Sequence, residues 1–174
     1  MNRTPQTNEQ QVFSYKYEDN IYDFNIGDGV FTPTDTTKLL ISGAIKAIDE
    51  PGKLLDLGCG SGIIGIMLSI LGKTQGQIHG SDLSQEAVEV AKANASNYGI
   101  EMDYRSGTLF DPWKGEKFDV ILDDVPGISK KIREYSDWFE EGVPFSPGED
   151  GADLMCQVLK EAPEYLNENG MLIF

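Results

Sequence analysis

The feature that most constrains the fold of this chain is the stretch at residues 54–65, which reads LLDLGCGSGIIG. A short apolar run contains one acid, Asp56, close to its end. Three glycines then alternate with other residues, and apolar residues follow. That pattern predicts a strand, a tight turn and a helix. Glycine lets such a turn adopt positive φ and lets a ligand approach closely, and the following helix directs its free N–H groups at the same space. The stretch therefore predicts a binding site for a small polar ligand at the carboxyl edge of a parallel sheet.

Strand and helix signals alternate along most of the chain. The strands expected in the core are, in chain order, residues 53–57, 77–82, 101–106, 118–123 and 171–174. Helices are expected at about residues 62–71, between a cap at Ser84 and a stop at Gly99, and at residues 152–166, the last kinked or ended near Pro163. The alternation predicts an α/β fold, a doubly wound parallel sheet with Rossmann-like strand order 3-2-1-4-5.

The N-terminal third divides into a tail and a packed segment. Residues 1–12 are polar and are expected to be disordered, whereas residues 13–50 supply a strand and a helix packed on the core. Residues 51–174 form the α/β domain that carries the glycine turn. No linker divides the chain, so we expect one domain overall.

Composition limits the partners of this chain. It has 14 basic and 29 acidic residues, giving a net charge of −15, which argues against nucleic-acid binding because that binding depends on Lys and Arg. A small molecule or a protein is the better substrate prediction, although the charge could serve solubility alone. Two cysteines and one histidine indicate neither a disulfide framework nor a metal site. We expect a cytoplasmic protein that makes no membrane contact.

Two cofactors compete for the glycine turn. Residues 60–65 match the dinucleotide fingerprint G-x-G-x-x-G, and Asp82 lies about 20 residues on, where that motif places an acid. The same stretch is similar to D-x-G-x-G-x-G, the first motif of S-adenosylmethionine (SAM) methyltransferases. SAM carries an ammonium and a sulfonium rather than a diphosphate, so the acid Asp56 beside the turn favours SAM. A nicotinamide-dependent oxidoreductase stays as the weaker alternative.

The chain resembles class I SAM-dependent methyltransferases over nearly its whole length. Within that class it is most similar to the release-factor glutamine methyltransferases and their small-domain relatives. The stretches that carry the resemblance are residues 29–33, 54–65, 107–112 and 148–153, together with Asp82. The resemblance implies a SAM-binding Rossmann-like domain that transfers a methyl group.

The resemblance also implies where the cofactor binds. The amino-acid end of SAM is expected at the turn, the ribose at Asp82, and the adenine between Leu83 and the pair Thr108 and Leu109. The implied cofactor residues are Phe31, Asp56, Gly58, Cys59, Gly60, Gly62, Ile63, Asp82, Leu83, Thr108, Leu109 and Asp124. Phe31 could instead anchor the N-terminal segment in the core.

The resemblance breaks at the end of the fourth core strand. The relatives have Asn-Pro-Pro-Tyr there, which holds and stacks on the planar target nitrogen, whereas this chain has Asp124-Val125-Pro126-Gly127. Asp124 and Pro126 are the candidate catalytic residues, with Asp124 binding or deprotonating the acceptor, or else only capping its turn. Asp123 is expected to point to the other side of the strand.

Three aromatic residues beyond that motif, Tyr135, Trp138 and Phe139, could wall a substrate pocket or simply pack a lid. His79, the only histidine in the sequence, is expected to be structural. The relatives add a strand hairpin after the fifth core strand, where this sequence stops at Phe174. We therefore expect a cut portion of a longer protein, or an edge left open or covered by a partner.

The function predicted is methyl transfer from SAM to a nitrogen or oxygen of a small molecule or a protein side chain. The alternative is a SAM-binding subunit without activity of its own, suggested by the altered motif at Asp124 and the missing last strands.

Overall fold

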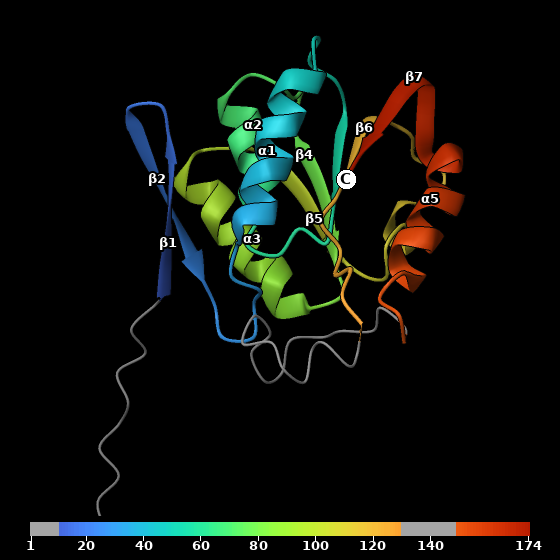
Figure 1. Ribbon diagram of the computed structural model, residues 1–174. Helices are drawn as coiled ribbons and strands as arrows, with labels where there is room; N and C mark the ends of the chain where they lie inside the picture. The colour runs from blue at the N-terminus through green and yellow to red at the C-terminus, as the bar shows by residue number, and fades with distance from the viewer. Residues whose placement is uncertain (1–10, 130–148) are drawn as a thin grey trace, which may run out of the picture.

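The computed structural model describes residues 11–129 and 149–174 (Figure 1). Its strands are β1 (Gln11–Tyr17), β2 (Asn20–Ile26), β3 (Leu54–Leu57), β4 (Ile78–Asp82), β5 (Met102–Ser106), β6 (Phe118–Asp123) and β7 (Leu166–Ile173). Its helices are α1 (Asp35–Ala47), α2 (Ile63–Ile70), α3 (Gln85–Asn97) and α5 (Asp153–Tyr165), with a 3₁₀ turn, η1, at Asp111–Trp113. Within these ranges no helix has the length and apolarity needed to cross a bilayer.

The central sheet has five strands in the order β5-β4-β3-β6-β7, and every pairing is parallel. This confirms the predicted α/β fold and the strand order. Leu57, the last residue of β3, pairs with Ser81 of β4 and with Asp123 of β6. The register therefore brings the ends of the three central strands, and the loops that follow them, to one edge of the sheet.

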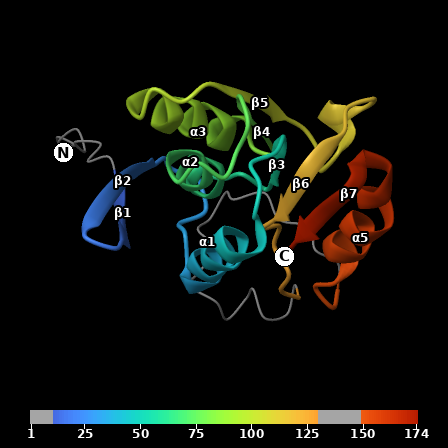
Figure 2. The ribbon, with the colours of Figure 1, turned by 90° about the horizontal axis from the view of Figure 1, so that it is seen from above.

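Helices cover both faces of this sheet. Seen from above, α1, α2 and α3 lie on one side and α5 on the other (Figure 2). Alternate residues of a strand point to opposite faces, so Leu54 joins the core beneath α1, α2 and α3, and Leu55 joins the core beneath α5. All four residues of β3 are buried, as expected for the middle strand of a doubly covered sheet.

The β1–β2 hairpin packs on the outside of helix α3. The Asn94 side chain donates to the carbonyl of Asn25 and accepts from its N–H, both at 2.9 Å. It also donates to the carbonyl of Ser61, at 2.9 Å, inside the glycine-rich stretch. The Tyr98 hydroxyl donates to the carbonyl of Asp23 at 2.9 Å. One buried amide thus connects the N-terminal hairpin to the turn that follows β3.

The last strand begins earlier than the sequence suggests. We predicted it from residue 171, but β7 starts at Leu166, which pairs with Phe118 of β6. A register shift separates this pair from the next one, Met171 with Val120, and Asn169 lies between them with a φ of 65°. The polar residues 167–169 lie in this irregular part of β7. At the other end of the chain, β1 begins at Gln11.

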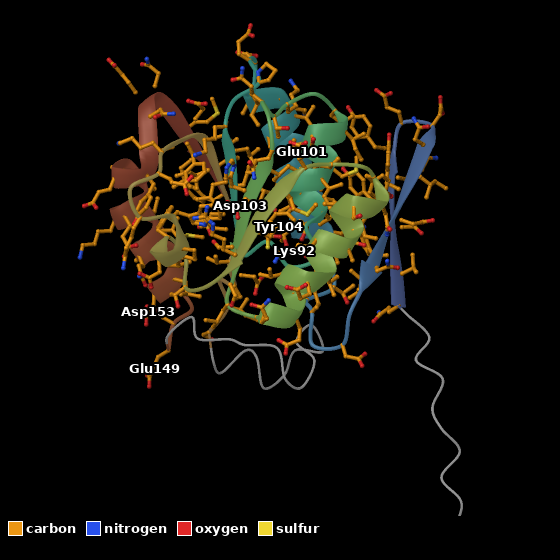
Figure 3. The ribbon with its side chains drawn as sticks, turned by 180° about the vertical axis from the view of Figure 1, so that it is seen from behind. Lys92, Glu101, Asp103, Tyr104, Glu149 and Asp153 are labelled. Atoms are coloured by element: carbon orange, nitrogen blue, oxygen red, sulfur yellow. The ribbon has the colours of Figure 1, made fainter. Side chains whose placement is uncertain are left out.

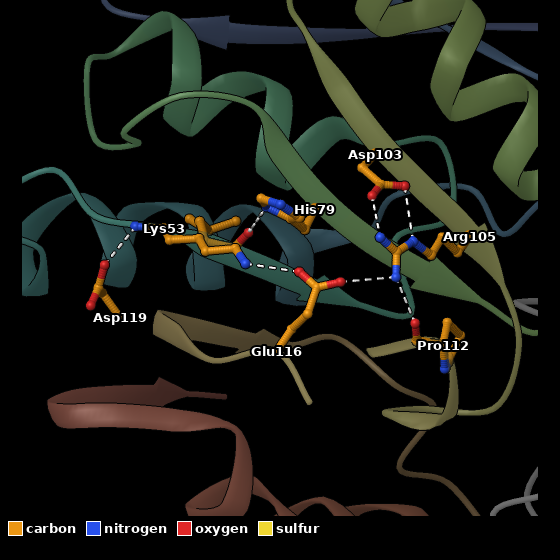
Figure 4. Close-up of polar contacts among 8 residues, drawn as sticks. Lys53, His79, Asp103, Arg105, Pro112, Glu116 and Asp119 are labelled. Carbon is orange, nitrogen blue, oxygen red and sulfur yellow. Dashed lines mark hydrogen bonds and ion pairs between the residues drawn. The ribbon is translucent and has the colours of Figure 1, made fainter. Parts of the chain in front are cut away.

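A network of charged side chains joins Lys53, just before β3, to β5 and to the segment before β6 (Figure 4). Glu116 accepts from Lys53 at 2.8 Å and pairs with Arg105 at 3.0 Å. The Arg105 guanidinium lies 4.0 Å from the ring centre of Trp113, and the Lys53 ammonium 4.6 Å from that of Phe118. Both cations therefore cover aromatic residues of the core.

His79 lies in the same region, away from the carboxyl edge. Its ring is buried, its Nδ1 is 3.3 Å from the carbonyl oxygen of Leu54, and it lies T-shaped to the rings of Trp113 and Phe118. Burial lowers the pKa of His79, with the charge of Lys53 as the next cause. These contacts agree with a structural role.

Two helical glycines offer a matched test of how tightly helix α2 packs on the sheet. A Cβ at Gly65 would lie 2.7 Å from Cγ2 of the buried Ile78, whereas a Cβ at Gly43 in α1 would meet no atom within 4 Å. Gly65→Ala should lower the free energy of unfolding by about 1–3 kcal/mol through overpacking. Gly43→Ala should raise it by about 0.5–1 kcal/mol through helix propensity. Denaturant titration of both variants measures the difference, and equal effects would contradict the close packing.

Candidate functional site

A cavity of about 660 Å³ lies at the carboxyl edge of the sheet. This volume is within the range of small-molecule sites. Most of the predicted site residues line it: Phe31, Gly58, Cys59, Gly60, Ile63, Asp82, Leu83, Thr108, Leu109, Asp124 and Pro126. The loops after four strands, the segment leading into α1 and the first turn of α5 thus enclose one space.

The glycine turn after β3 has the backbone that its sequence predicts. Gly58, Gly60 and Gly62 have φ values of 71°, 50° and 79°, which side chains disfavour. The carbonyl of Ser81 accepts from the N–H groups of Gly58 and Cys59 at 2.8 and 3.0 Å. A Cβ at Gly58 would lie 3.3 Å from the carbonyl oxygen of Asp124. The turn can therefore lie close to the β6 loop only because this position is glycine.

Asp82, at the end of β4, fixes the turn from the side. Its Oδ2 accepts from the N–H of Gly60 and its Oδ1 from the N–H of Ser84, both at 2.9 Å. Ser84 is the N-cap of α3, and its hydroxyl accepts from the N–H of Ala87 at 3.2 Å. Burial raises the pKa of Asp82, and the backbone hydrogen bonds counteract that rise. A carboxylate still has lone pairs for ligand hydroxyls after accepting two such bonds.

Two residues predicted to hold the cofactor, Asp56 and Gly62, do not line the cavity. Asp56 lies beneath the turn because its side chain faces helix α2, where Oδ2 accepts from the N–H of Gly65 at 3.3 Å. Its Oδ1 has no hydrogen-bond partner among the described residues. Burial, followed by the charge of Asp124, raises the pKa of Asp56 to about 8. Asp56 can therefore act on a ligand only through the turn above it.

Tyr104 is the second polar side chain beneath the turn. It lies on β5, beside the helix α3 that carries Lys92 (Figure 3). Its buried hydroxyl has no hydrogen-bond partner within the described ranges, and a Cβ at Gly62 would lie 3.2 Å from it. The sequence offered no sign that Gly62 serves packing in this way rather than ligand contact.

Asp124 follows β6 and Asp82 ends β4, so the two acids lie on either side of the central strand β3. Its Oδ2 accepts from the hydroxyl of Thr37, in the first turn of α1, at 3.0 Å. Burial raises the pKa of Asp124 to about 6, and the bond from Thr37 partly counteracts it. The Asp124 side chain is thus held by a helix distant in the sequence, and does not only cap its own turn.

Asp123, which we expected to point to the other side of the strand from Asp124, is also among the residues that line the cavity. It is the last residue of β6, and its Oδ1 turns back to accept from the N–H of Val125 at 3.2 Å. Burial raises the pKa of Asp123 to about 6, with the charge of Asp124 adding to the rise.

Sequence reasoning missed Thr37 and three apolar residues of the cavity wall, Leu154, Met155 and Phe174. The Thr-rich run before α1 signalled a helix start, and the N–H of Thr34 does donate to the Thr37 hydroxyl at 3.3 Å. Nothing local pointed from there to Asp124. The predicted pocket residues Tyr135, Trp138 and Phe139 lie outside the described residues.

In the described ranges, no group of three His, Cys, Asp or Glu side chains could hold a metal ion. The cavity fits SAM: it has a glycine-rich turn, an acid one strand away and apolar residues in its walls. This arrangement, on a five-stranded parallel sheet, agrees with the Rossmann-like methyltransferase predicted from the sequence. A solved 16S rRNA N2 methyltransferase from T. thermophilus, in complex with AdoMet and guanosine, shares the fold: TM-score 0.69, 19% identity, 97% of this chain and 42% of that one.

The chain belongs to the methyltransferase small domain family, whose model matches residues 21–138. It is 31% identical over 166 residues to a release factor glutamine methyltransferase of Bacillus anthracis, covering 87% of this chain and 57% of that protein. It is 33% identical over 162 residues to a ribosomal protein uL3 glutamine methyltransferase of Francisella tularensis, covering 87% and 51%. The chain thus spans about half the length of the curated relatives it matches.

Family membership confirms the predicted class of protein, a methyltransferase, and the predicted cofactor, SAM. The relatives favour this main prediction over a subunit without activity and over an oxidoreductase. The role of each site residue remains a prediction.

The buried Asp56 should make stability depend on pH. Its pKa is about 8 in the folded chain and near 3.9 when unfolded. The stability it contributes is therefore fully present below about pH 4 and is lost as pH rises through about 8. Asp56→Asn cannot titrate, so its melting temperature should rise relative to that of the parent between about pH 5 and 8. Thermal denaturation at several pH values measures this, and a constant difference would show that Asp56 is ionised when folded.

Proposed function

We propose that this chain binds SAM and transfers its methyl group to a nitrogen atom of a protein side chain. The observation that carries the proposal is that the glycine turn and the β6 carboxylates line one cavity. The relatives are named for glutamine side chains of a release factor and of ribosomal protein uL3, which supports a side-chain nitrogen. The net charge of −15 suits a protein partner with a basic surface better than a nucleic acid.

The proposed position of SAM follows the cavity wall. Its amino-acid end lies over Gly58 and Gly60, with Asp56 acting through the turn, and its ribose faces Asp82. Its adenine lies between Leu83, whose side chain is 54% exposed, and the loop at Thr108 and Leu109. An exposed leucine at a cavity mouth is a surface that a planar base can cover.

Methyl transfer needs position more than acid–base strength. The chemistry that SAM supplies is a methyl group on a sulfonium, already reactive toward a lone pair. The chain's own residues would hold the acceptor in line and exclude water. We assign Asp124 to accept a hydrogen bond from the acceptor nitrogen, and Pro126 to fix the loop that carries the Val125 carbonyl.

The outer edge of β7 is unpaired in the described part of the chain. An unpaired parallel edge strand is a template for a further strand. We propose that a segment of a partner pairs with this edge, and the support for it is that β7 has a neighbour on one side only among the described strands.

The ribose assignment is tested by Asp82→Ala. Its loss leaves the N–H of Gly60 and the cofactor hydroxyls unpaired, so SAM affinity should fall by about 1–3 kcal/mol, or roughly 5- to 150-fold. Asp82→Asn keeps one acceptor oxygen and should lose less. Titration calorimetry with SAM measures both, and unchanged affinity in the alanine variant would remove Asp82 from the cofactor site.

The role of Asp124 in turnover is tested by Asp124→Asn and Asp124→Ala. Both should keep SAM affinity within about twofold while changing the rate of methyl transfer by about tenfold or more, since the lost contact is made to the reacting acceptor. Transfer of labelled methyl to purified release factor and ribosomal protein uL3 measures the rate. If neither substitution alters transfer, Asp124 has no part in catalysis.

A further inference from the structure

The acceptor end of the cavity carries two carboxylates side by side in the sequence. Asp123 and Asp124 both line it, and Asp123 is only 7% exposed. Each accepts one hydrogen bond: Asp123 from the N–H of Val125, and Asp124 from the hydroxyl of Thr37. Each carboxylate can therefore accept further bonds from a ligand.

No cation from the described residues balances these carboxylates within the cavity. Its described lining contains three acids, Asp82, Asp123 and Asp124, and no lysine, arginine or histidine. Asp82 is turned to the glycine turn and α3 by two backbone bonds, which leaves the β6 pair as the negative charge of the acceptor end. Bound SAM contributes one net positive charge and cannot neutralise all of them. Negative charge that remains in a partly buried cavity favours a positively charged ligand.

Thr37 determines which way the Asp124 carboxylate faces. It is 2% exposed, lies in the first turn of α1, and donates to Oδ2. A hydroxyl donates one hydrogen, so this donor is committed to Asp124 and is not available to the acceptor. The other oxygen, Oδ1, is left to accept from a ligand.

A carboxamide acceptor fits this end of the cavity less well than an amine. Residue 127 is an exposed glycine, so it offers no ring to stack on a planar amide. An amide is neutral and gains no charge pairing from two carboxylates. An ammonium group carries the charge opposite to that of both carboxylates and has three hydrogen bonds to donate.

We infer that the acceptor nitrogen is an amine of the lysine type, bound as an ammonium between Asp123 and Asp124, with Thr37 as the residue that positions Asp124. The inference rests on the proposed function and names the acceptor class of that same site.

The reaction balances with the groups present. The ammonium gives one proton to the Asp124 carboxylate, which frees a nitrogen lone pair. Burial raises the pKa of Asp124 to about 6, so it is a stronger base than an exposed carboxylate. A nitrogen–carbon bond then forms as the methyl carbon–sulfur bond breaks, and the bonding pair stays on sulfur. The products are a methylammonium and S-adenosylhomocysteine, and Asp124 returns its proton to water.

Binding of small probes tests the assignment without knowledge of the natural substrate. The purified chain is saturated with S-adenosylhomocysteine and titrated with n-butylammonium chloride, with butyramide, and with sodium chloride as the ionic control. Butylammonium should bind about tenfold more tightly than butyramide, because charge-assisted hydrogen bonds are the stronger ones. Asp124→Asn should reduce this preference to about equal binding. Asp49→Asn changes the same charge at an exposed position outside the cavity and should keep it.

Two variants of Thr37 separate positioning from simple packing. Thr37→Val keeps the shape but loses the hydroxyl, and should lower the preference for butylammonium severalfold. Thr37→Ser keeps the hydroxyl and should restore it. Equal preference in the valine and serine variants would overturn the positioning role.

Methyl transfer gives the covalent test. Label from SAM is followed into two degenerate peptide pools that differ only in a central lysine or glutamine. Label in the lysine pool supports the inference. Label in the glutamine pool alone, or tighter binding of butyramide, overturns it while the proposed function stands. A chain that fails to bind S-adenosylhomocysteine overturns both.

Discussion

The carboxylate of Asp82 connects three parts of the molecule that meet at the carboxyl edge of the sheet. It accepts from Gly60 in the turn after β3 and from Ser84 at the start of α3, and it belongs itself to β4. Without these bonds, the Ser81 carbonyl is the one acceptor among the described residues of β4 that holds the turn. The position of the turn, which lines the cavity at Gly58, Cys59 and Gly60, therefore depends on a side chain one strand away.

Most of the fold could be predicted because its signals are local. The glycines after residue 57 must form a turn, and the alternation of strands and helices leaves few topologies. The start of β7 was missed because Leu166 joins the sheet before an irregularity at Asn169, and the polar residues between them resemble an ordinary loop.

The site was less predictable where contacts span long stretches of sequence. The bond from Thr37 to Asp124 joins residues 87 apart, and no local pattern encodes it. Asp56 was placed in the cavity because the acid stands next to the glycines, but its side chain faces the N–H of Gly65 instead.

The segment between the hairpin and α1 has both of its ends fixed. Asn25 is bound by Asn94 of α3, and Thr37 is bound to Asp124, while Phe31 between them lines the cavity. Surface connections usually accept insertions and deletions because their ends do not depend on their length. Here one added or deleted residue would have to be absorbed in the cavity wall. The sequence of the segment between β2 and α1 can therefore vary in evolution more freely than its length.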